Sequence, residues 1–449
     1  MFYNARKIAV DILKAVYYEE AYSNLTINRF FNQYDVEEKD RSFITRIVYG
    51  TIQNTYYIDH VINTYSKVKT KKMKPLILIT LRMSIYQILF MEKVPDSAAC
   101  NEAVKLIKKT PYGRLAGFVN GVCRSVARGD KEVKLPDFQK QPLEYLSIKY
   151  SFPIWLLEIW YSELEDYRAL EELLDKMNQP KGVTLRCNTL KTTPDQLKSL
   201  FDEKGVEYDR GQYTKEAFHI KKGSSVTNLP GFEEGLFTVQ DESSMLVAYA
   251  MAPDKGDVIL DLCSAPGGKA THIAQWTDDQ CMIISKDLHA HKIELIVENC
   301  ERLGITSVKA EVGDATVLDE TLIEKADKVL VDAPCSGLGI INNKPEIKLN
   351  KDLDDIQSLI KIQRKILSVA ARYVKKGGVL IYSTCTINKK ENSDNIKWFT
   401  ENYPYECMSL KKHLPESLDC DTIDNGYVQL LPQEHGTDGF FIAKMIRKD

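Results

Sequence analysis

The sequence lacks any uninterrupted run of 18 or more apolar residues, so no segment has the length and apolarity of a membrane-spanning helix. Its first residues, Met1 to Lys7, lead into an amphipathic pattern and not into the apolar core of a signal peptide. We therefore expect a cytoplasmic protein without a membrane partner. The 449 residues, 44% of them hydrophobic, are enough for two or three domains.

The ten cysteines include no Cys-x-x-Cys pair, and His289-x-His291 has no further ligand at metal spacing. This pattern argues against a structural zinc ion, and we expect no metal. The cysteines are spread from Cys100 to Cys420 without a tight framework, which is typical of reduced thiols in a cytosolic protein.

Two nucleotide-binding signatures are also missing. No Gly-x-Gly-x-x-Gly occurs at the start of a βαβ unit, which argues against a dinucleotide site. Gly268-Lys269-Ala270 lacks the hydroxyl residue that follows the lysine in a phosphate-binding loop. The chain also contains no internal repeat and no low-complexity tract.

Positive charge is concentrated at the front of the chain. Residues 1–150 carry 24 Lys and Arg against 15 Asp and Glu, a net charge of +9 in a chain whose total is −3. The remaining residues therefore carry −12. A basic front end on an acidic body predicts that the front end meets a polyanion.

Residues 1–135 are predicted to form an all-helical domain, with apolar residues at helical spacing such as Leu78, Leu81 and Ile85. Between its middle helices lies a lysine cluster that we expect to contact RNA phosphates, although a solvated edge would have the same composition. The cluster consists of Lys67, Lys69, Lys71, Lys72 and Lys74.

Residues 129–140 are polar and contain Pro136, which is typical of a linker. Residues 141–235 predict a small α+β domain, in which Val183 to Thr189 alternates like a strand. Arg186 in that strand is a candidate RNA contact, and the pattern equally allows an ordinary surface residue.

From residue 236 to 449 strand patterns alternate with helical stretches, which predicts a mostly parallel sheet with helices on both faces, a Rossmann-like α/β fold. The closing strand is expected at an edge and antiparallel. The predicted strands are 257–262, 282–287, 308–312, 328–332, 378–383 and 439–446.

Several of these strands end in residues that can bind a nucleoside. The turn after the first strand carries Gly267 and Gly268, which let a ligand approach the backbone. Asp287 follows about 20 residues later, where a carboxylate reaches ribose hydroxyls. Asp314 and Asp332 end two later strands. Acids that recur at one sheet edge predict a site for an adenosine-like ligand.

Two cysteines share this strand-end context, Cys335 in Asp332-Ala-Pro-Cys-Ser-Gly337 and Cys385 in Ser383-Thr-Cys-Thr386. A cysteine thiolate that adds to carbon 6 of a pyrimidine makes carbon 5 nucleophilic enough to accept a methyl group. Asp332 can hydrogen-bond the ring and activate it. On spacing alone either cysteine can be the nucleophile. No histidine has a comparable context, which argues against a thiol hydrolase.

These motifs, with Cys263-Ser-Ala-Pro-Gly-Gly-Lys269, resemble those of the NOL/NOP/sun family of S-adenosylmethionine-dependent RNA 5-methylcytosine methyltransferases. The front end resembles the RNA-binding protein NusB, in its succession of helices and in stretches such as Asp40 to Gly50 and Phe118 to Arg124. Together they resemble the bacterial members of the family that methylate a cytosine of 16S ribosomal RNA.

The resemblance implies a nucleophilic Cys385, a Cys335 that assists product release and an Asp332 that activates the base. It implies a methyl donor, S-adenosylmethionine, and a partner, 16S ribosomal RNA, free or in early small-subunit assembly; we expect a monomer. The implied cofactor contacts are Cys263, Ser264, Ala265, Pro266, Gly267, Gly268, Lys269, Asp287, Asp314 and Asp332.

One departure concerns Asn342 and Asn343, where the family commonly has arginines, and it leaves RNA contacts near the target base open. Three alternatives remain. The substrate is transfer RNA or another ribosomal site, the chain is an inert RNA-binding assembly factor, or Cys335 is the nucleophile, as in DNA cytosine methyltransferases.

Overall fold

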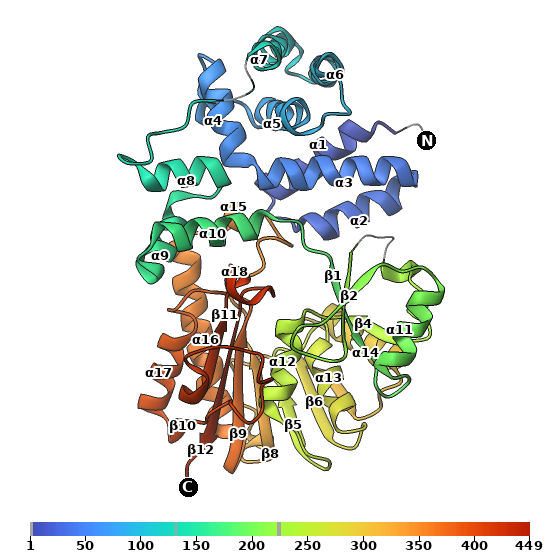
Figure 1. Ribbon diagram of the computed structural model, residues 1–449, viewed down its shortest axis with the longest axis vertical. Coiled ribbons are helices and arrows are strands. Elements are labelled where there is room, and N and C mark those ends of the chain that lie inside the picture. Colours follow the sequence, from blue (N-terminus) through green and yellow to red (C-terminus); the bar gives the residue numbers. More distant parts are fainter. Residues whose placement is uncertain (1–2, 130, 132, 222–225) are drawn as a thin grey trace. The chain divides into compact units, whose positions relative to one another are not determined.

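The computed structural model describes residues 3–129, 131, 133–221 and 226–449. The chain divides into two compact units, each of which makes most of its residue contacts within itself (Figure 1). One contains Met1–Gln179 and Ile341–Asp352, and the other contains Pro180–Ile340 and Leu353–Asp449. The boundary at 179/180 lies inside the range 141–235, for which we expected one small domain, so the division into 1–135, 141–235 and 236–449 stays a prediction.

The described part of the first unit contains only helices, which confirms the expectation for its front end. They are α1 (Ala5–Tyr18), α2 (Ser23–Tyr34), α3 (Glu38–Gln53), α4 (Thr55–Tyr65), η1 (Thr70–Lys72), α5 (Pro75–Phe90), α6 (Asp96–Lys108), η2 (Gly113–Leu115), α7 (Ala116–Arg128), α8 (Pro142–Tyr150), α9 (Ile154–Leu164), α10 (Tyr167–Asn178) and α15 (Ile347–Asn350).

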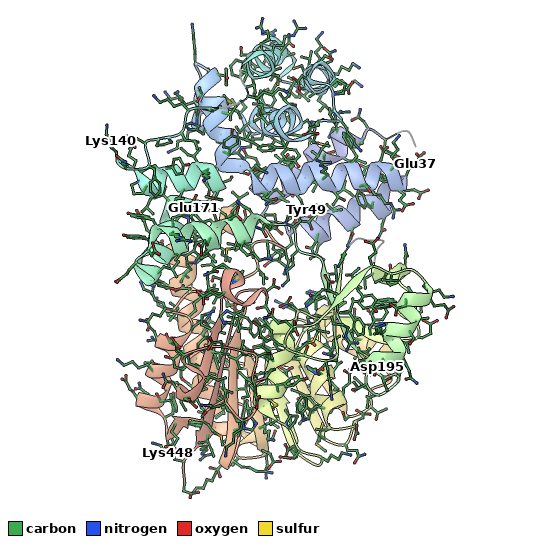
Figure 2. The ribbon with its side chains drawn as sticks, in the orientation of Figure 1. Glu37, Tyr49, Lys140, Glu171, Asp195 and Lys448 are labelled. Carbon is green, nitrogen blue, oxygen red and sulfur yellow. The ribbon has the colours of Figure 1, made fainter. Side chains whose placement is uncertain are left out.

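Helix α5 is the centre of this unit, because it contacts α1, α3, α4, α6 and α7. It is buried on nearly all sides, as its apolar sequence from Ile77 to Ile88 requires. Helices α8 and α10 are joined by Glu171, whose carboxylate accepts hydrogen bonds from Lys149 Nζ at 2.8 Å and Tyr150 OH at 2.9 Å (Figure 2).

The segment 341–352, far along the sequence, belongs to this unit through buried polar contacts. Glu346 accepts hydrogen bonds from the backbone N–H and the hydroxyl of Ser23, both at 2.9 Å. Ser23 begins α2, whose N-cap residue Tyr22 supplies no side-chain cap. Glu346 therefore supplies an acceptor and a negative charge at this helix N-terminus.

The described part of the second unit contains two sheets. The smaller is antiparallel in the order β2-β3-β1-β4, with α11 and η3 beside it and a core of Leu185, Phe201, Phe218 and Phe237. Its elements are β1 (Val183–Cys187), α11 (Pro194–Glu203), β2 (Tyr208–Arg210), β3 (Ala217–Ile220), η3 (Val226–Asn228) and β4 (Phe237–Val239).

The larger sheet has eight strands in the order β10-β12-β9-β8-β5-β6-β7, with β11 paired to β12. Strands β5 to β9 are parallel. Strand β12 is antiparallel to its neighbours, as predicted, but it lies between β10 and β9 and not at the edge where we expected it, because the short strand β10 pairs with it on the outer side. The strands are β5 (Val258–Asp261), β6 (Met282–Asp287), β7 (Val308–Val312), β8 (Ala326–Asp332), β9 (Val374–Thr384), β10 (Tyr405–Cys407), β11 (Tyr427–Leu430) and β12 (Phe440–Arg447).

Helices cover both faces of this sheet, as predicted. Residues of α12, α13 and α14 pack on one face, against Leu330 of β8, and residues of α16 and α17 pack on the other, against Val329 and Val331. The helices are α12 (Glu242–Met251), α13 (Gly268–Trp276), α14 (Ala290–Leu303), η4 (Glu320–Leu322), α16 (Leu353–Tyr373), α17 (Ser393–Asn402), η5 (Ile423–Asn425) and α18 (Pro432–His435).

The strand order reverses on the two sides of β5, whose neighbours are β6 and β8. In an open α/β sheet ligands bind beyond the carboxyl ends of the strands at such a point. In the described part of the chain no helix has the length and apolar character needed to span a membrane.

Candidate active site

The turn from β5 into α13 forms one wall of the site. Gly267 has a φ of +93°, a conformation that side chains disfavour, and a Cβ there would press on Ile296 at 3.2 Å. The tight turn brings the backbone of Cys263 to Gly268 to the carboxyl ends of β5 and β6. Helix α13 begins at Gly268, so its free N–H groups lie at this edge.

A cavity of about 340 Å³ opens between this turn and the ends of β6, β7 and β8. Five residues of the expected cofactor set line it: Cys263, Ala265, Asp287, Asp314 and Asp332. Sequence reasoning missed its apolar walls, among them Leu288 and Ile362. Each is a large apolar side chain left substantially exposed, which only the folded chain reveals.

Asp287 is held at the end of β6 and is only 6% exposed. One carboxylate oxygen accepts a hydrogen bond from the backbone N–H of Ala265 at 3.3 Å, and the other lies 3.4 Å from Lys292 Nζ. Asp314, after β7, accepts hydrogen bonds from the N–H and hydroxyl of Thr316, which lower its pKa. Both carboxylates are therefore oriented before any ligand arrives.

A second cavity of about 250 Å³ shares Cys263, Ala265 and Asp332 with the first. The expected cofactor residues Ser264, Pro266, Gly268 and Lys269 line this second cavity and not the first. Asp261, the last residue of β5, also lines it. Burial raises the pKa of Asp261 to about 7.

Asp332 lies between the two cavities with its carboxylate clamped on both sides. Lys269 Nζ lies 2.7 Å from one oxygen, and the Ser383 hydroxyl donates to the other at 2.8 Å. Burial lowers the pKa of Lys269, but the Asp332 carboxylate, with further contributions from Cys385 and Asp261, outweighs this and leaves that pKa above its ordinary value. The ammonium therefore stays charged beside Asp332 and Cys385.

The two cysteines predicted at this edge meet. Cys335 follows β8, Cys385 follows β9, and their sulfur atoms are 3.4 Å apart. The hydrogen bond with Cys385, together with burial, raises the pKa of Cys335 well above its ordinary value. Either sulfur can donate the hydrogen that lies between them, and the raised pKa of Cys335 favours its thiol form.

The buried carboxylate of Glu391, which no sequence motif singled out, holds the Cys335 loop in place. Glu391 accepts hydrogen bonds from the N–H and hydroxyl of Ser336, at 2.9 and 2.6 Å, and from Gln363 at 3.0 Å. Gln363 also donates to the carbonyl of Pro334 at 3.0 Å. Glu391 lies six residues after Cys385, so one side chain ties the two cysteine loops together.

Close backbone approach brings the same loops together from the other side. The N–H of Gly339 donates to the carbonyl of Cys385 at 3.0 Å, and the N–H of Gly439 donates to the carbonyl of Gly339 at 2.9 Å. A Cβ on Gly339 would overlap the carbonyl oxygen of Gly439. Glycine is therefore required where these loops cross.

The structure places the residues that we expected to contact RNA in different environments. All five lysines of the cluster, Lys67, Lys69, Lys71, Lys72 and Lys74, are exposed around η1. Arg186 is fully buried, and burial lowers its pKa to about 9. It donates hydrogen bonds to the Gly268 carbonyl at 2.6 Å and to Gln275 and Thr271 at 3.0 Å. The expected RNA contact of Arg186 is thus wrong for this structure, because its side chain braces α13 from within.

Family models match three parts of the chain. A model described as 16S rRNA methyltransferase RsmB/F matches residues 248–446, one of the NusB family matches 3–128, and one of a ferredoxin-like domain of RsmF/B-like methyltransferases matches 152–227. The chain is 39% identical over 448 residues to a probable ribosomal RNA small subunit methyltransferase B of Bacillus subtilis, covering 99% of each chain. The chain belongs to the ribosomal RNA small subunit methyltransferase B family.

Another member of the family and two solved structures are also similar to this chain. The ribosomal RNA small subunit methyltransferase B of Proteus mirabilis is 29% identical and covers 99% of each chain. A crystal structure of PH0851 superposes with a TM-score of 0.83 at 28% identity, with 99% of each chain covered. The structure of NSun6 from Pyrococcus horikoshii with SFG covers 66% of this chain and 99% of that one, with a TM-score of 0.60 at 24% identity, which supports the fold. The methyltransferase, NusB and ferredoxin-like domains matched in this chain are thus the domains of this family.

Proposed function

We propose that this methyltransferase transfers a methyl group from S-adenosylmethionine to carbon 5 of an unpaired cytosine in 16S ribosomal RNA, through a covalent bond between Cys385 and carbon 6. The observation that carries the proposal is the 3.4 Å approach of Cys335 and Cys385 beside the Lys269–Asp332 ion pair. Asp332 lines both cavities and Lys269 lines the second, and the two thiols lie on the loops that follow β8 and β9.

The first cavity suits the methyl donor. Its volume lies at the low end of the range for small-ligand sites. The Asp287 carboxylate can accept hydrogen bonds from ribose hydroxyls, and Leu288 and Ile362 offer apolar surface to an adenine ring. When bound there, S-adenosylmethionine supplies a methyl group on a positively charged sulfur. The remaining chemistry belongs to the residues of this chain.

Cys385 forms the first bond. Its thiolate attacks carbon 6 of the cytosine, and the electrons of the carbon 5–carbon 6 double bond become available at carbon 5. Lys269 stabilises the thiolate before attack. The Asp332 carboxylate accepts a hydrogen bond from the exocyclic amino group and orients the ring. Because both faces of the ring are needed, the base must leave its stack.

After methyl transfer a base removes the proton from carbon 5, and the bond between sulfur and carbon 6 breaks to restore the double bond. Cys335 is suited to this stage, because its sulfur lies 3.4 Å from that of Cys385 and its pKa is raised, which favours the thiol form. It can donate its proton to the departing thiolate. The family resemblance implies Cys385 as the nucleophile, and the raised pKa of the Cys335 thiol is consistent with that role for Cys385.

The test compares Cys335→Ala and Cys385→Ala with labelled S-adenosylmethionine and unmodified 16S ribosomal RNA. Cys407→Ala, which removes an exposed cysteine of β10 outside both motifs, is the matched control. We expect Cys335→Ala to accumulate a protein–RNA adduct that survives denaturation, and Cys385→Ala to form neither adduct nor methylated RNA. An adduct that depends on Cys335 would exchange the two roles.

The substrate is tested separately, by mapping the labelled nucleotide in total RNA. Label at a cytosine of 16S ribosomal RNA supports the proposal, and label confined to transfer RNA or another ribosomal RNA replaces the substrate while keeping the chemistry. A wild-type protein that binds S-adenosylmethionine and ribosomal RNA without methylating any RNA would support the assembly-factor alternative.

A further inference from the structure

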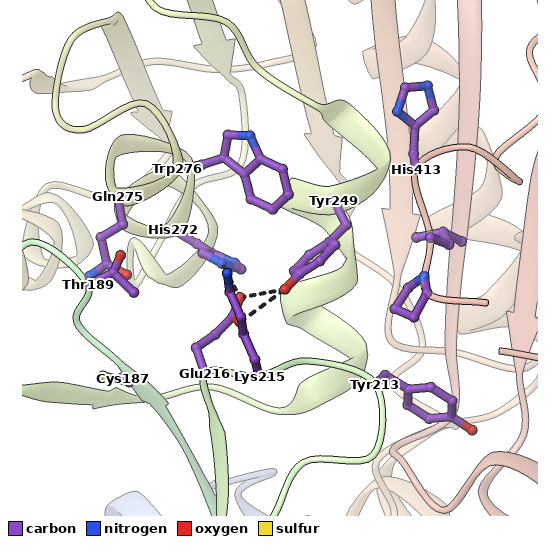
Figure 3. A pocket seen from close by; sticks show the side chains of 12 residues that line it. Cys187, Thr189, Tyr213, Lys215, Glu216, Tyr249, His272, Gln275, Trp276 and His413 are labelled. Atoms are coloured by element: carbon purple, nitrogen blue, oxygen red, sulfur yellow. Dashed lines mark hydrogen bonds and ion pairs between the residues drawn. The ribbon is translucent and has the colours of Figure 1, made fainter. Parts of the chain in front are cut away.

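A third cavity of about 610 Å³ lies in the second unit, lined by residues distinct from those of the two cavities already described. Its walls come from the loop before β3, from α12 and α13, and from the segment after β10 (Figure 3). The volume lies within the range of small-ligand sites.

One wall is aromatic. Tyr249 of α12 and Trp276 at the end of α13 contact each other edge to face, with ring centroids 4.7 Å apart and planes at 73°. Trp276 remains 41% exposed although it lines a cavity. Figure 3 shows the two rings on one side and His413 on the other. An open indole face at a cavity is a stacking platform for a planar ring.

The floor carries a buried hydrogen-bond acceptor. Glu216 is 5% exposed and accepts hydrogen bonds from the Tyr249 hydroxyl at 3.0 and 3.1 Å and from His272 Nε2 at 3.2 Å. Burial raises the pKa of Glu216, but the hydrogen bond from His272 outweighs this, and the pKa lies below its ordinary value. An ionised carboxylate has about four acceptor positions, so Glu216 can accept from a ligand as well.

The rim carries a positive charge. Lys215 is exposed and lines the cavity next to Glu216. Within the ranges that the structure describes, its ammonium forms no ion pair. A stacking face, a buried carboxylate and a rim ammonium match the three parts of a nucleotide: the base plane, an amino group on the base edge, and the phosphate.

We propose that this cavity binds one unpaired nucleotide of the RNA substrate, distinct from the cytosine that is methylated. Its base stacks on Trp276, an amino group of guanine, adenine or cytosine donates to Glu216, and its phosphate lies at Lys215. The inference rests on the proposed function, because it takes the nucleotide from the same RNA. It gives the second unit an RNA contact in addition to the target cytosine, at the cavity between α12, α13 and the loop before β3.

The test measures RNA binding and methylation by the full chain with Trp276→Ala, Trp276→Phe and Lys215→Ala. Matched controls are Trp398→Ala, a tryptophan of α17, and Lys204→Ala, an exposed lysine beside the small sheet. We expect Trp276→Ala to weaken RNA binding about 5- to 150-fold, the range of one lost base stack. Trp276→Phe should retain most of the affinity, and Lys215→Ala should reduce the salt dependence.

The kinetic signature is a higher KM for RNA, with kcat at saturating RNA and the KM for S-adenosylmethionine unchanged. Ultraviolet cross-linking of wild type should attach a nucleotide to the peptide that contains Trp276. Methylation of RNA together with unaltered RNA binding by Trp276→Ala overturns this inference alone. RNA binding that depends on Trp276 without any methyl transfer overturns the proposed function alone.

A free nucleotide has the same base, amino group and phosphate as a nucleotide of the RNA strand, so it could occupy the same cavity. Titration of guanosine and cytidine monophosphates, with the cofactor cavity saturated by S-adenosylhomocysteine, is followed by tryptophan fluorescence. One outcome would assign the cavity to free nucleotides and overturn the assignment to the RNA strand. In that outcome the monophosphates quench the fluorescence of wild type but not of Trp276→Phe, and no variant changes the affinity for RNA. Competition of the monophosphates against RNA would support it.

Discussion

Lys269 and Asp332 form an ion pair, with 2.7 Å between nitrogen and oxygen, where the two cavities of the active site join. The ammonium also lies 5.2 Å from the centroid of the Phe440 ring. Both charges are largely buried, so each depends on the other for stabilisation. The pair places a positive charge close to Cys385 and fixes the position of the Asp332 carboxylate, which can accept a hydrogen bond.

Replacing Lys269 with Met should lower kcat by about 10²-fold or more, because the Cys385 thiolate and the Asp332 carboxylate lose their common positive charge. Lys269→Arg should restore part of the rate. Rates come from methyl transfer to RNA at saturating substrates, with Lys309→Met, an exposed lysine of β7, as the control. A Lys269→Met protein with the wild-type rate would remove this lysine from the mechanism.

Replacing Asp287 with Ala should weaken S-adenosylmethionine binding by about 10- to 150-fold, the effect of losing a charged hydrogen bond worth ~1.5–3 kcal/mol. RNA affinity should change little, because Asp287 lies in the first cavity. Calorimetric titration measures the former and filter binding the latter. Asp424→Ala, at an exposed position, controls for loss of a carboxylate. Equal cofactor affinity in Asp287→Ala and wild type would exclude a ribose contact.

Neutralising Lys69, Lys71 and Lys72 together should weaken RNA binding and reduce the slope of log K against log salt concentration by about 0.7–0.9 for each lost phosphate contact. The control removes the same charge at three scattered lysines of the first unit, Lys39, Lys93 and Lys140, of which Figure 2 labels the last. If both triple variants show the same slope, the cluster is only a solvated edge.

Asp261 should make the wild-type protein less stable as pH rises. Its pKa is about 7 in the folded state against 3.8 ordinarily, so between these values the folded chain holds one proton more than the unfolded chain. The stability from that proton is complete below pH 4 and lost above pH 7, at about 1.4 kcal/mol per pH unit between them. Asp261→Asn should lack this dependence.

The measurement is the free energy of unfolding of both proteins without cofactor from pH 5 to pH 8. The stability of Asp261→Asn relative to wild type should rise across this range and level off at its upper end. If the unfolding free energies of the two proteins change with pH in parallel, Asp261 is ionised over the whole range and burial does not raise its pKa.

The sequence by itself determined the succession of strands β5 to β9 along the chain and the edge of the large sheet at which the site forms. Strands β5 to β9 are long or strongly apolar, and parallel strands bring their carboxyl ends to one edge. Asp287, Asp314 and Asp332 therefore had to meet. The strands β10 and β11 were not predicted, because segments of three or four residues such as Tyr405–Cys407 and Tyr427–Leu430 show no clear alternation.

Only the tertiary structure decided which side chains contact one another. Cys335 and Cys385 were expected at the same edge, but their 3.4 Å approach depends on the crossing of two loops. The burial of Arg186, the support from Glu391 and the nucleotide-sized space beside Trp276 left no trace in local periodicity. Periodicity and turn residues report neighbours along the chain, whereas packing between elements far apart in sequence sets distances, burial and pKa.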